Sequence, residues 1–312
     1  MRRVLCREFA DPERFELVEE PDPEPGPGEV LVAVEAAAVS FVDGLIARGG
    51  YQLRPPLPFT PGTAVAGTTP DGRRVAALLT SFGGFASHVV VPEERLVPVP
   101  DGVDAGVAAS SMESHGTIAF AFRDRVTVRP GEWVVVLGAS GGIGQAAVDH
   151  ARAAGARVLA LASTPDKRAA ALAAGAEAAV GYDALKDTIR EHTGGGADVV
   201  IDPVGGDAAE AALRALGAGG RFCVLGFTSG AIPKRPANVV LLRNRTVVGV
   251  DWGDWSRTDP AASRDLAEDV LRRIGAGELH PARPRALPLA DAATATRAYA
   301  ERSAVGKLVL TP

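Results

Sequence analysis

The stretch that decides the fold of this chain is WVVVLGASGGIGQAA, which runs from Trp133 to Ala147. Its apolar first part is typical of a buried strand, its clustered glycines of a tight turn, and its alanine-rich end of a helix. We expect Gly141 to let the backbone approach a pyrophosphate and Gly144 to let the helix pack closely on the strand. Ala139 stands where the usual pattern has its first glycine, so the prediction of a dinucleotide site needs support from the rest of the sequence.

Composition narrows the class of protein. The 312 residues are long enough for two domains, and 46% hydrophobic with 5% aromatic residues is typical of aliphatic α/β cores. The net charge is -5, and acidic and basic residues are mixed along the chain. This distribution provides no basic surface that would bind nucleic acid or an acidic membrane. We therefore expect a small-molecule partner.

Cysteine usage and the N-terminus indicate the compartment. Cys6 and Cys223 lie far apart and cannot supply a cysteine-rich zinc lobe or a disulfide framework. The first residues lack an apolar signal core, and no run approaches the roughly 20 apolar residues of a membrane span. These features predict a soluble, cytoplasmic protein.

The pattern of expected secondary structure changes near residue 120. Up to about residue 120, short apolar runs such as Val30 to Val34 and His88 to Val91 alternate with proline and glycine, which predicts an antiparallel, partly barrel-like domain. Beyond that point alanine-rich helical stretches separate six expected strands, and this alternation predicts a parallel, doubly wound sheet. The expected strands are 134–137, 157–161, 178–180, 198–201, 221–225 and 246–250.

The C-terminal residues return to the first domain in this interpretation. We expect helices near 262–274 and 290–302 and a strand at 307–310. The predicted domains are therefore 1–122 together with 256–312, and 123–255.

The end of the second strand of the sheet indicates which nucleotide binds. An NAD-binding chain places an acid there against the ribose 2'-hydroxyl, whereas this strand ends at Ser163. Thr164 is a plausible N-cap with Pro165 at the first helical position. Since Ser163, Lys167 and Arg168 can donate to a 2'-phosphate, NADPH is the better fit. The alternative is that Lys167 and Arg168 form a solvated helix face, which we favour for Arg168.

Several separate segments carry a resemblance to a known family. They include Val39 to Asp43, Pro61 to Thr63, Asp202 to Gly206 and, most specifically, Leu225 to Gly230 and Asn244 to Gly253. With these segments the chain resembles, nearly end to end, the zinc-independent quinone oxidoreductases of the medium-chain dehydrogenase/reductase superfamily. The resemblance implies a GroES-like catalytic domain completed by the C-terminal tail, a Rossmann domain, and a homodimer joined by edge strands near Thr246 to Val250.

The resemblance also implies residue roles. Gly142 and Ile143 would touch the pyrophosphate, and Ser163, Lys167 and Tyr182 would hold the 2'-phosphate end. The residues expected near the nicotinamide are Thr117, Phe227, Ser229 and Trp252. Tyr182 could instead pack in a loop, and Phe227 and Trp252 could belong to the core.

No metal is expected. Zinc members of the superfamily need a thiolate where this chain has Ser40 and an acid where it has Ala64. The five histidines are scattered, with no short spacing that would place two on one helical face.

Without a Lewis acid, the substrate must accept hydride readily, as a quinone or a conjugated carbonyl does. Tyr51 matches a tyrosine that related enoyl reductases are thought to use as proton donor, although it could simply pack at the cleft mouth. Ser40 replaces the asparagine common in the family and could bind a carbonyl or carboxamide oxygen. Asp43 is expected to cap or brace the same turn.

Two departures from the relatives stand out. Glu113 and His115 form a titratable pair just before the Gly116–Thr117 step, where they could relay a proton or lie on the helix surface. The passage from 67 to 75 is about ten residues shorter than usual by comparison with the family, which would open the rim of the cleft.

These expectations together predict a zinc-free, NADPH-dependent reductase of quinones or α,β-unsaturated carbonyls, with hydride delivered from nicotinamide C4 into the cleft between domains. Enoyl-thioester reduction is the nearest enzymatic alternative. A regulatory or RNA-associated nucleotide-binding protein with little turnover is the alternative from another class, and the acidic balance argues against RNA.

Overall fold

The computed structural model describes residues 1–312, which divide into two compact units. Unit 1 contains Met1–Glu113, Trp255–Gly277 and Ala282–Pro312, and unit 2 contains Ser114–Asp254 and Glu278–Pro281. The first boundary falls inside the continuous helix α2 (Ala105–Phe120). A sequence gives no signal for such a boundary, because the helix continues while its contacts change from one unit to the other.

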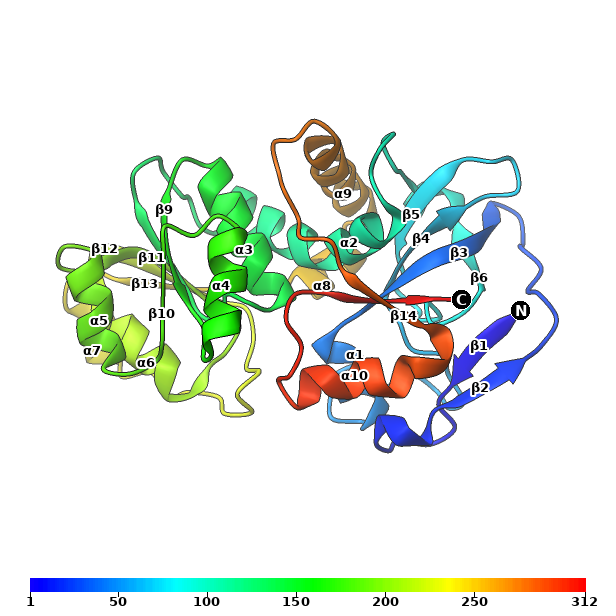
Figure 1. Ribbon diagram of the computed structural model, residues 1–312, viewed down its shortest axis with the longest axis horizontal. Coiled ribbons are helices and arrows are strands. Elements are labelled where there is room, and N and C mark those ends of the chain that lie inside the picture. Colours follow the sequence, from blue (N-terminus) through cyan, green and yellow to red (C-terminus); the bar gives the residue numbers. More distant parts are fainter. The chain divides into compact units, whose positions relative to one another are not determined.

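Unit 2 is built on a six-stranded parallel sheet with strand order β10-β9-β8-β11-β12-β13 (Figure 1). From β8 the sheet first grows to one side, through β9 and β10, and then to the other, through β11, β12 and β13, as expected for a doubly wound fold. All six predicted strands are present, so the predicted fold class is confirmed. Their bounds are β8 (Trp133–Val136), β9 (Arg157–Leu161), β10 (Ala178–Val180), β11 (Ala197–Asp202), β12 (Leu216–Val224) and β13 (Thr246–Gly249).

Strand β12 begins five residues earlier than we expected from the sequence. The first half of β12 has no apolar pattern typical of a strand, because it contains Gly217, Gly219 and Gly220. Glycine carries no side chain and has a low strand propensity. The pairing with β11 shifts register between Ala197 and Val199, where this glycine-rich segment enters the sheet.

The central strands bury both faces, which is why they are continuously apolar. In β8, Val134 and Val136 face one helical layer, while Val135 and the following Leu137 face the other. The first layer contains α3 (Gly142–Ala153) and α4 (Pro165–Ala173). The second contains α5 (Leu185–His192), α6 (Gly206–Ala215) and α7 (Ala237–Leu241) (Figure 1).

Unit 1 is built on a mainly antiparallel seven-stranded sheet with path β14-β15-β3-β4-β5-β7, and β6 pairs with β3 beside this path. The strand bounds are β3 (Glu29–Val39), β4 (Ala64–Thr68), β5 (Arg74–Leu78), β6 (His88–Pro92), β7 (Val97–Pro98), β14 (Arg285–Pro288) and β15 (Leu308–Thr311). A separate antiparallel pair is formed by β1 (Arg2–Leu5) and β2 (Glu16–Glu19). Unit 1 also contains the helices α1 (Phe41–Ala47), α9 (Pro260–Gly275) and α10 (Ala292–Ala300), and a boundary between the two units falls inside α8 (Trp252–Thr258).

Most of the C-terminal segment belongs to unit 1. Strand β15 pairs with β3 in the register Leu308↔Val39, so the chain's last strand lies against one of its first. This pairing also brings the segment before β15 to the end of β3, where α1 begins.

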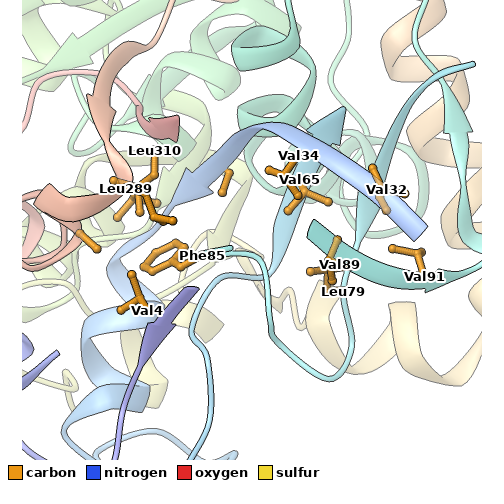
Figure 2. Packing of buried hydrophobic residues seen from close by; sticks show 14 of the residues in the cluster. Val4, Val32, Val34, Val65, Leu79, Phe85, Val89, Val91, Leu289 and Leu310 are labelled. Atoms are coloured by element: carbon orange, nitrogen blue, oxygen red, sulfur yellow. The ribbon is translucent and has the colours of Figure 1, made fainter. Parts of the chain in front are cut away.

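The core of unit 1 gathers around Phe85, whose side chain is fully buried (Figure 2). Val4 from β1 and Leu289 and Leu310 from the C-terminal segment belong to the same cluster. The two ends of the chain are therefore held by one apolar cluster, which explains why the unit is discontinuous in sequence.

The shortened passage from 67 to 75 is a tight hairpin. Strands β4 and β5 pair from Ala64↔Leu78 to Thr68↔Arg74, and the Thr69 amide donates to the Arg73 carbonyl at 3.0 Å. None of the helices is both long and apolar enough to span a bilayer.

Candidate functional site

The glycine turn after β8 has the geometry of an anion site at a helix N-terminus. Gly138 has a φ of +61°, and a Cβ there would lie 2.9 Å from Val204. Gly141 is the N-cap of α3, and a Cβ at Gly141 would have only the Gly138 carbonyl oxygen nearby, at 3.5 Å. The first-turn amides that follow have no acceptor within the helix, so they can bind an anion.

Gly144 has the packing role that we predicted for it. A Cβ at Gly144 would lie 2.2 Å from the Gly138 carbonyl oxygen and 2.6 Å from the Ala139 Cα. Both obstacles are backbone atoms that cannot move aside as a flexible side chain can. The first turn of α3 therefore approaches the strand end this closely only because residue 144 lacks a side chain.

The end of β9 has the polar character expected for a 2'-phosphate. Ser163 is exposed and Lys167 half-buried, and the first acid, Asp166, lies within the first turn of α4. Thr164 caps that helix, since its hydroxyl accepts from the Lys167 amide at 3.3 Å, and the predicted cap is confirmed. Arg168 is held by the Ala162 carbonyl at 3.4 Å.

The Tyr182 hydroxyl lies between the glycine turn and the end of β9. It accepts from the Gly138 amide at 2.9 Å and donates to the Leu161 carbonyl at 3.3 Å. Burial raises the pKa of this phenol. Tyr182 thus links the ends of β8 and β9, the two strands whose turns flank the predicted site.

Two residues beside the turn after β11 had no role predicted from the sequence: Asp202, the last residue of β11, and Arg235, from the segment before α7. Asp202 is fully buried and accepts from the amides of Val204 at 2.9 Å and Gly205 at 2.8 Å, and Arg235 lies 3.4 Å away. Burial raises the pKa of this carboxyl group. Asp202 could have been noticed in the sequence, because it is an acid that ends an apolar strand just before Pro203. Nothing in the sequence indicated the position of Arg235, because its guanidinium stacks on the Phe222 ring only in the folded chain.

This turn lies against the segment after β12. A Cβ at Gly205 would lie 3.0 Å from the Phe227 ring, and one at Gly206 would lie 3.0 Å from the Ser229 hydroxyl. Phe227 is 37% exposed, so the alternative of a core role does not hold for it. The structure thus brings Phe227 and Ser229 to the same edge of the sheet as the glycine turn.

Trp252 and Thr117 belong to a neighbouring part of unit 2. Trp252 is buried and packs against Gly116, where a Cβ would lie 3.1 Å from the indole ring. Its indole N–H is buried without an acceptor. Thr117 is half-buried on α2, next to this contact.

In unit 1, Ser40 and Asp43 form a capping box at the start of α1, which confirms the bracing role predicted for Asp43. The Ser40 amide donates to Asp43 Oδ2 at 2.7 Å, and the two side chains are 3.0 Å apart. Asp43 Oδ1 also accepts from the Gly62 amide at 3.2 Å. Tyr51 follows α1, is half-buried and packs against the cluster of Cys6, Ile46 and Phe59.

The structure gives Glu113 and His115 separate partners. Glu113 Oε2 lies 3.2 Å from Lys307 Nζ in unit 1, whereas His115 Nε2 lies 3.5 Å from Asp149 in unit 2. His115 is buried, so it is not a surface residue. A relay that requires Glu113 and His115 to act as one pair does not fit this arrangement.

The donor set does not fit a zinc ion. Ser40 and Ala64 offer no thiolate or carboxylate at the two positions that zinc members use, and the Ser40 hydroxyl is engaged in the capping box. No group of three or more His, Cys, Asp or Glu side chains is placed to hold a metal ion.

A doubly wound parallel sheet with an anion site at the glycine turn defines a dinucleotide-binding protein. Residues 26–101 match the family described as alcohol dehydrogenase GroES-like domain, and residues 142–268 match the zinc-binding dehydrogenase family. The chain is 35% identical to quinone oxidoreductase-like protein 2 of Bos taurus, over 99% of this chain and 92% of the relative.

Solved structures agree with these matches. The quinone oxidoreductase of Thermus thermophilus, described together with its complex with NADPH, is 35% identical, with a TM-score of 0.87 and full coverage of both chains. The chain also matches 15% of the length of a phthioceranic/hydroxyphthioceranic acid synthase of Mycobacterium tuberculosis, at 33% identity over 99% of this chain. This chain belongs to the medium-chain dehydrogenase/reductase superfamily, in its quinone oxidoreductase-like group, and the family uses NADP.

Proposed function

We propose that this protein is an NADPH-dependent oxidoreductase that reduces quinones or α,β-unsaturated carbonyl compounds without a catalytic metal. The observation that carries the choice of cofactor is the end of β9, where Ser163 is exposed, Lys167 is half-buried, and no acid ends the strand. A carboxylate there would bind the 2'-hydroxyl of NAD and repel a 2'-phosphate. The NADPH complex of the relative from Thermus thermophilus supports the same choice.

The cofactor residues take distinct parts in this proposal. The amides that follow Gly141 would hold the pyrophosphate, and Gly144 would keep α3 close enough for them to reach it. Ser163 and Lys167 would bind the 2'-phosphate, with Tyr182 fixing the two strand ends between which the nucleotide lies. The remaining proposed contacts are Gly142 and Ile143 for the pyrophosphate and Thr117, Phe227, Ser229 and Trp252 around the nicotinamide.

The chemistry follows from the donor set rather than from any one acid. NADPH supplies a hydride, and a quinone or an enone accepts one readily because its conjugated system spreads the developing negative charge. The chain then has to align the substrate and supply a proton. Ser40 and Tyr51 are the two hydroxyl groups we propose for that role, and the missing zinc ligands at Ser40 and Ala64 support metal-free chemistry.

The decisive experiment is NADPH oxidation by the purified protein against a panel of quinones, enones and enoyl thioesters, with NADH in parallel. Lys167→Met should raise the KM for NADPH about tenfold or more and leave the KM for NADH nearly unchanged, since it removes one charged hydrogen bond to the 2'-phosphate. Lys186→Met is the matched control, because Lys186 pairs with Asp187 on α5. An NADH preference in the parent protein would refute the assignment of the cofactor.

Enoyl-thioester reduction is the second candidate, favoured by the likeness to a segment of an acid synthase. The same panel separates it from quinone reduction. A regulatory or RNA-associated role with little turnover would be indicated if no acceptor were reduced while NADPH still bound. The net charge of -5 argues against RNA, and a salt-dependent gel shift would test it.

We also propose that the protein is a homodimer joined through β13. This strand is the edge of the six-stranded sheet, and Val247 is 36% exposed on it. Leu241 and Leu242, just before the strand, are 76% and 63% exposed. An exposed edge with apolar side chains is a template for pairing with another strand. Val247→Lys should convert the dimer to a monomer in light scattering, and a monomeric parent protein would refute the proposal.

We infer a reducing compartment such as the cytoplasm. Cys6 and Cys223 are both buried as free thiols, and neither is paired in a disulfide.

A further inference from the structure

Four segments of unit 1 bring a cluster of buried and half-buried titratable groups to the start of α1. Asp43 comes from α1, Glu113 from α2, Tyr299 from α10, and Lys307 from the residue just before β15. Asp43 is 1% exposed, and the side chains of Lys307 and Glu113 are 10% and 19% exposed. The Ser40 hydroxyl, which we propose as a substrate contact, lies 3.0 Å from Asp43 Oδ2.

The contacts show which member of the cluster lacks a counter-charge. Lys307 Nζ donates to Glu113 Oε2 at 3.2 Å and to the Val39 carbonyl at 3.1 Å. Asp43 accepts hydrogen bonds from the amides of Ser40 and Gly62 and forms no ion pair. Two carboxyl groups therefore share one ammonium group, and the ammonium is paired with Glu113.

A buried carboxylate without a cation is costly, and protonation removes that cost. Burial, followed by the nearby Glu113 charge, raises the pKa of Asp43 to about 7, even though Ser40 and Lys307 act in the opposite direction. Tyr299, also facing the cluster, has a pKa raised by burial, and the Glu113 charge keeps the pKa of Lys307 above its usual value despite burial. Asp43 is thus the group that titrates in the neutral range.

We propose that Asp43 is a positioning residue that holds a proton for Ser40 during substrate reduction. When Asp43 is ionised, its Oδ2 accepts the Ser40 hydroxyl hydrogen. When Asp43 is protonated, its O–H can donate to Ser40 Oγ, which releases the hydroxyl hydrogen for another acceptor. This inference rests on the proposed function, since it needs a substrate oxygen beside Ser40.

The proton step balances without any further reactant. The substrate gains a hydride from the proposed cofactor, and its oxygen then takes the hydroxyl proton of Ser40. The Ser40 oxygen takes the proton of Asp43 in the same movement, so Ser40 ends as a hydroxyl and Asp43 as a carboxylate. Asp43 regains a proton from solvent before the next turnover.

The first test is the pH profile of kcat for the best acceptor. We expect kcat to fall as pH rises through about 7, where Asp43 loses its proton. Glu113→Gln removes a neighbouring negative charge and should move this decline to lower pH by roughly one unit, whereas Lys307→Met should move it to higher pH. Asp43→Asn and Ser40→Ala should each lower kcat about 100-fold and abolish the decline. If Asp43 had only a structural role, Asp43→Asn would still lower kcat, but Glu113→Gln would leave the pH at which kcat declines unchanged.

The second test does not depend on turnover. Infrared spectra between pH 5 and 8 should show the C=O stretch of a protonated carboxylic acid that disappears as pH rises. The band should be lost in Asp43→Asn and kept in Asp149→Asn, a matched control in which the buried carboxyl is paired with Arg152 at 2.8 Å. If Lys307→Met does not fold, Glu113→Gln and the infrared band still decide the matter.

The outcomes separate this inference from the proposed function. If acceptors are reduced but the profile is the same in the parent protein and in Glu113→Gln, or the band is absent, the inference is overturned. If the band is present and titrates but no acceptor is reduced, the proposed function fails and the role in reduction falls with it.

Discussion

Replacing Gly144 by alanine should break the contact between α3 and the strand end. The added Cβ would lie 2.2 Å from the Gly138 carbonyl oxygen and 2.6 Å from the Ala139 Cα, so α3 must move away by roughly 1 Å to restore a normal contact. Because both neighbours are backbone atoms, we expect the upper end of the cost of overpacking, about 3 kcal/mol. For a domain of this size that is a loss of roughly 6–12 °C in the melting temperature.

Gly141→Ala is the matched variant at the same turn. Its φ of -81° suits alanine, and the nearest atom to the new Cβ is 3.5 Å away, so only the poorer N-cap should cost stability, about 1 kcal/mol. The methyl group would stand where the pyrophosphate must approach, and NADPH affinity should fall about tenfold or more. Differential scanning calorimetry and NADPH fluorescence titration measure the two effects. A Gly144→Ala protein as stable as the parent, or a Gly141→Ala protein that binds NADPH normally, would refute the reasoning.

Three further predictions, two on substitutions and one on thiol labelling, concern other parts of the molecule. Phe85→Ala removes the fully buried ring of the unit 1 core and should cost about 3–5 kcal/mol in urea unfolding; a cost below about 1 kcal/mol would contradict the packing of Figure 2. Although burial opposes ionisation, His115 and Arg152 hold the pKa of Asp149 below its usual value. The stability that Asp149 contributes should therefore be present above pH 4 and lost as pH falls below it, and Asp149→Asn should flatten this acid limb of stability. Burial raises the pKa of Cys223 to about 12, so thiol reagents should modify it only after unfolding, and rapid labelling of the native protein would show that β12 opens.

Several local features of both units were predictable because short-range chemistry decides them. The close approach at Gly144, the Thr164 cap and the capping box of Ser40 with Asp43 each involve residues a few positions apart, so the sequence already contains both partners. The central strands β8 and β11 of unit 2 were predictable because a strand buried on both faces is a continuous apolar run. The first half of β12 was missed because its glycines carry no such pattern.

Other features depend on contacts between distant segments. The stacking of Arg235 on Phe222, the Arg235–Asp202 pair and the contact between Tyr182 and the Gly138 amide join residues that no periodicity relates. The pairing of His115 on α2 with Asp149 on α3 likewise depends on how these two helices pack. It gives His115 a different partner from Glu113, which pairs with Lys307.

The sequence alone determined the class of fold and the local geometry of the glycine turn, because these follow from residue types at short spacings. Only the tertiary structure decided the charge state expected at Asp43, because that depends on burial and on how Glu113 and Lys307, 70 and 264 positions further along the chain, divide one counter-charge. The residues of the turn at Gly141 predicted a strand, a tight turn and a helix, and the prediction of a nucleotide site there needed the rest of the sequence. The proton that we propose Asp43 holds for Ser40 depends on the burial of Asp43 and on the nearby Glu113 and Lys307, and Lys307 reaches this place because β15 pairs with β3.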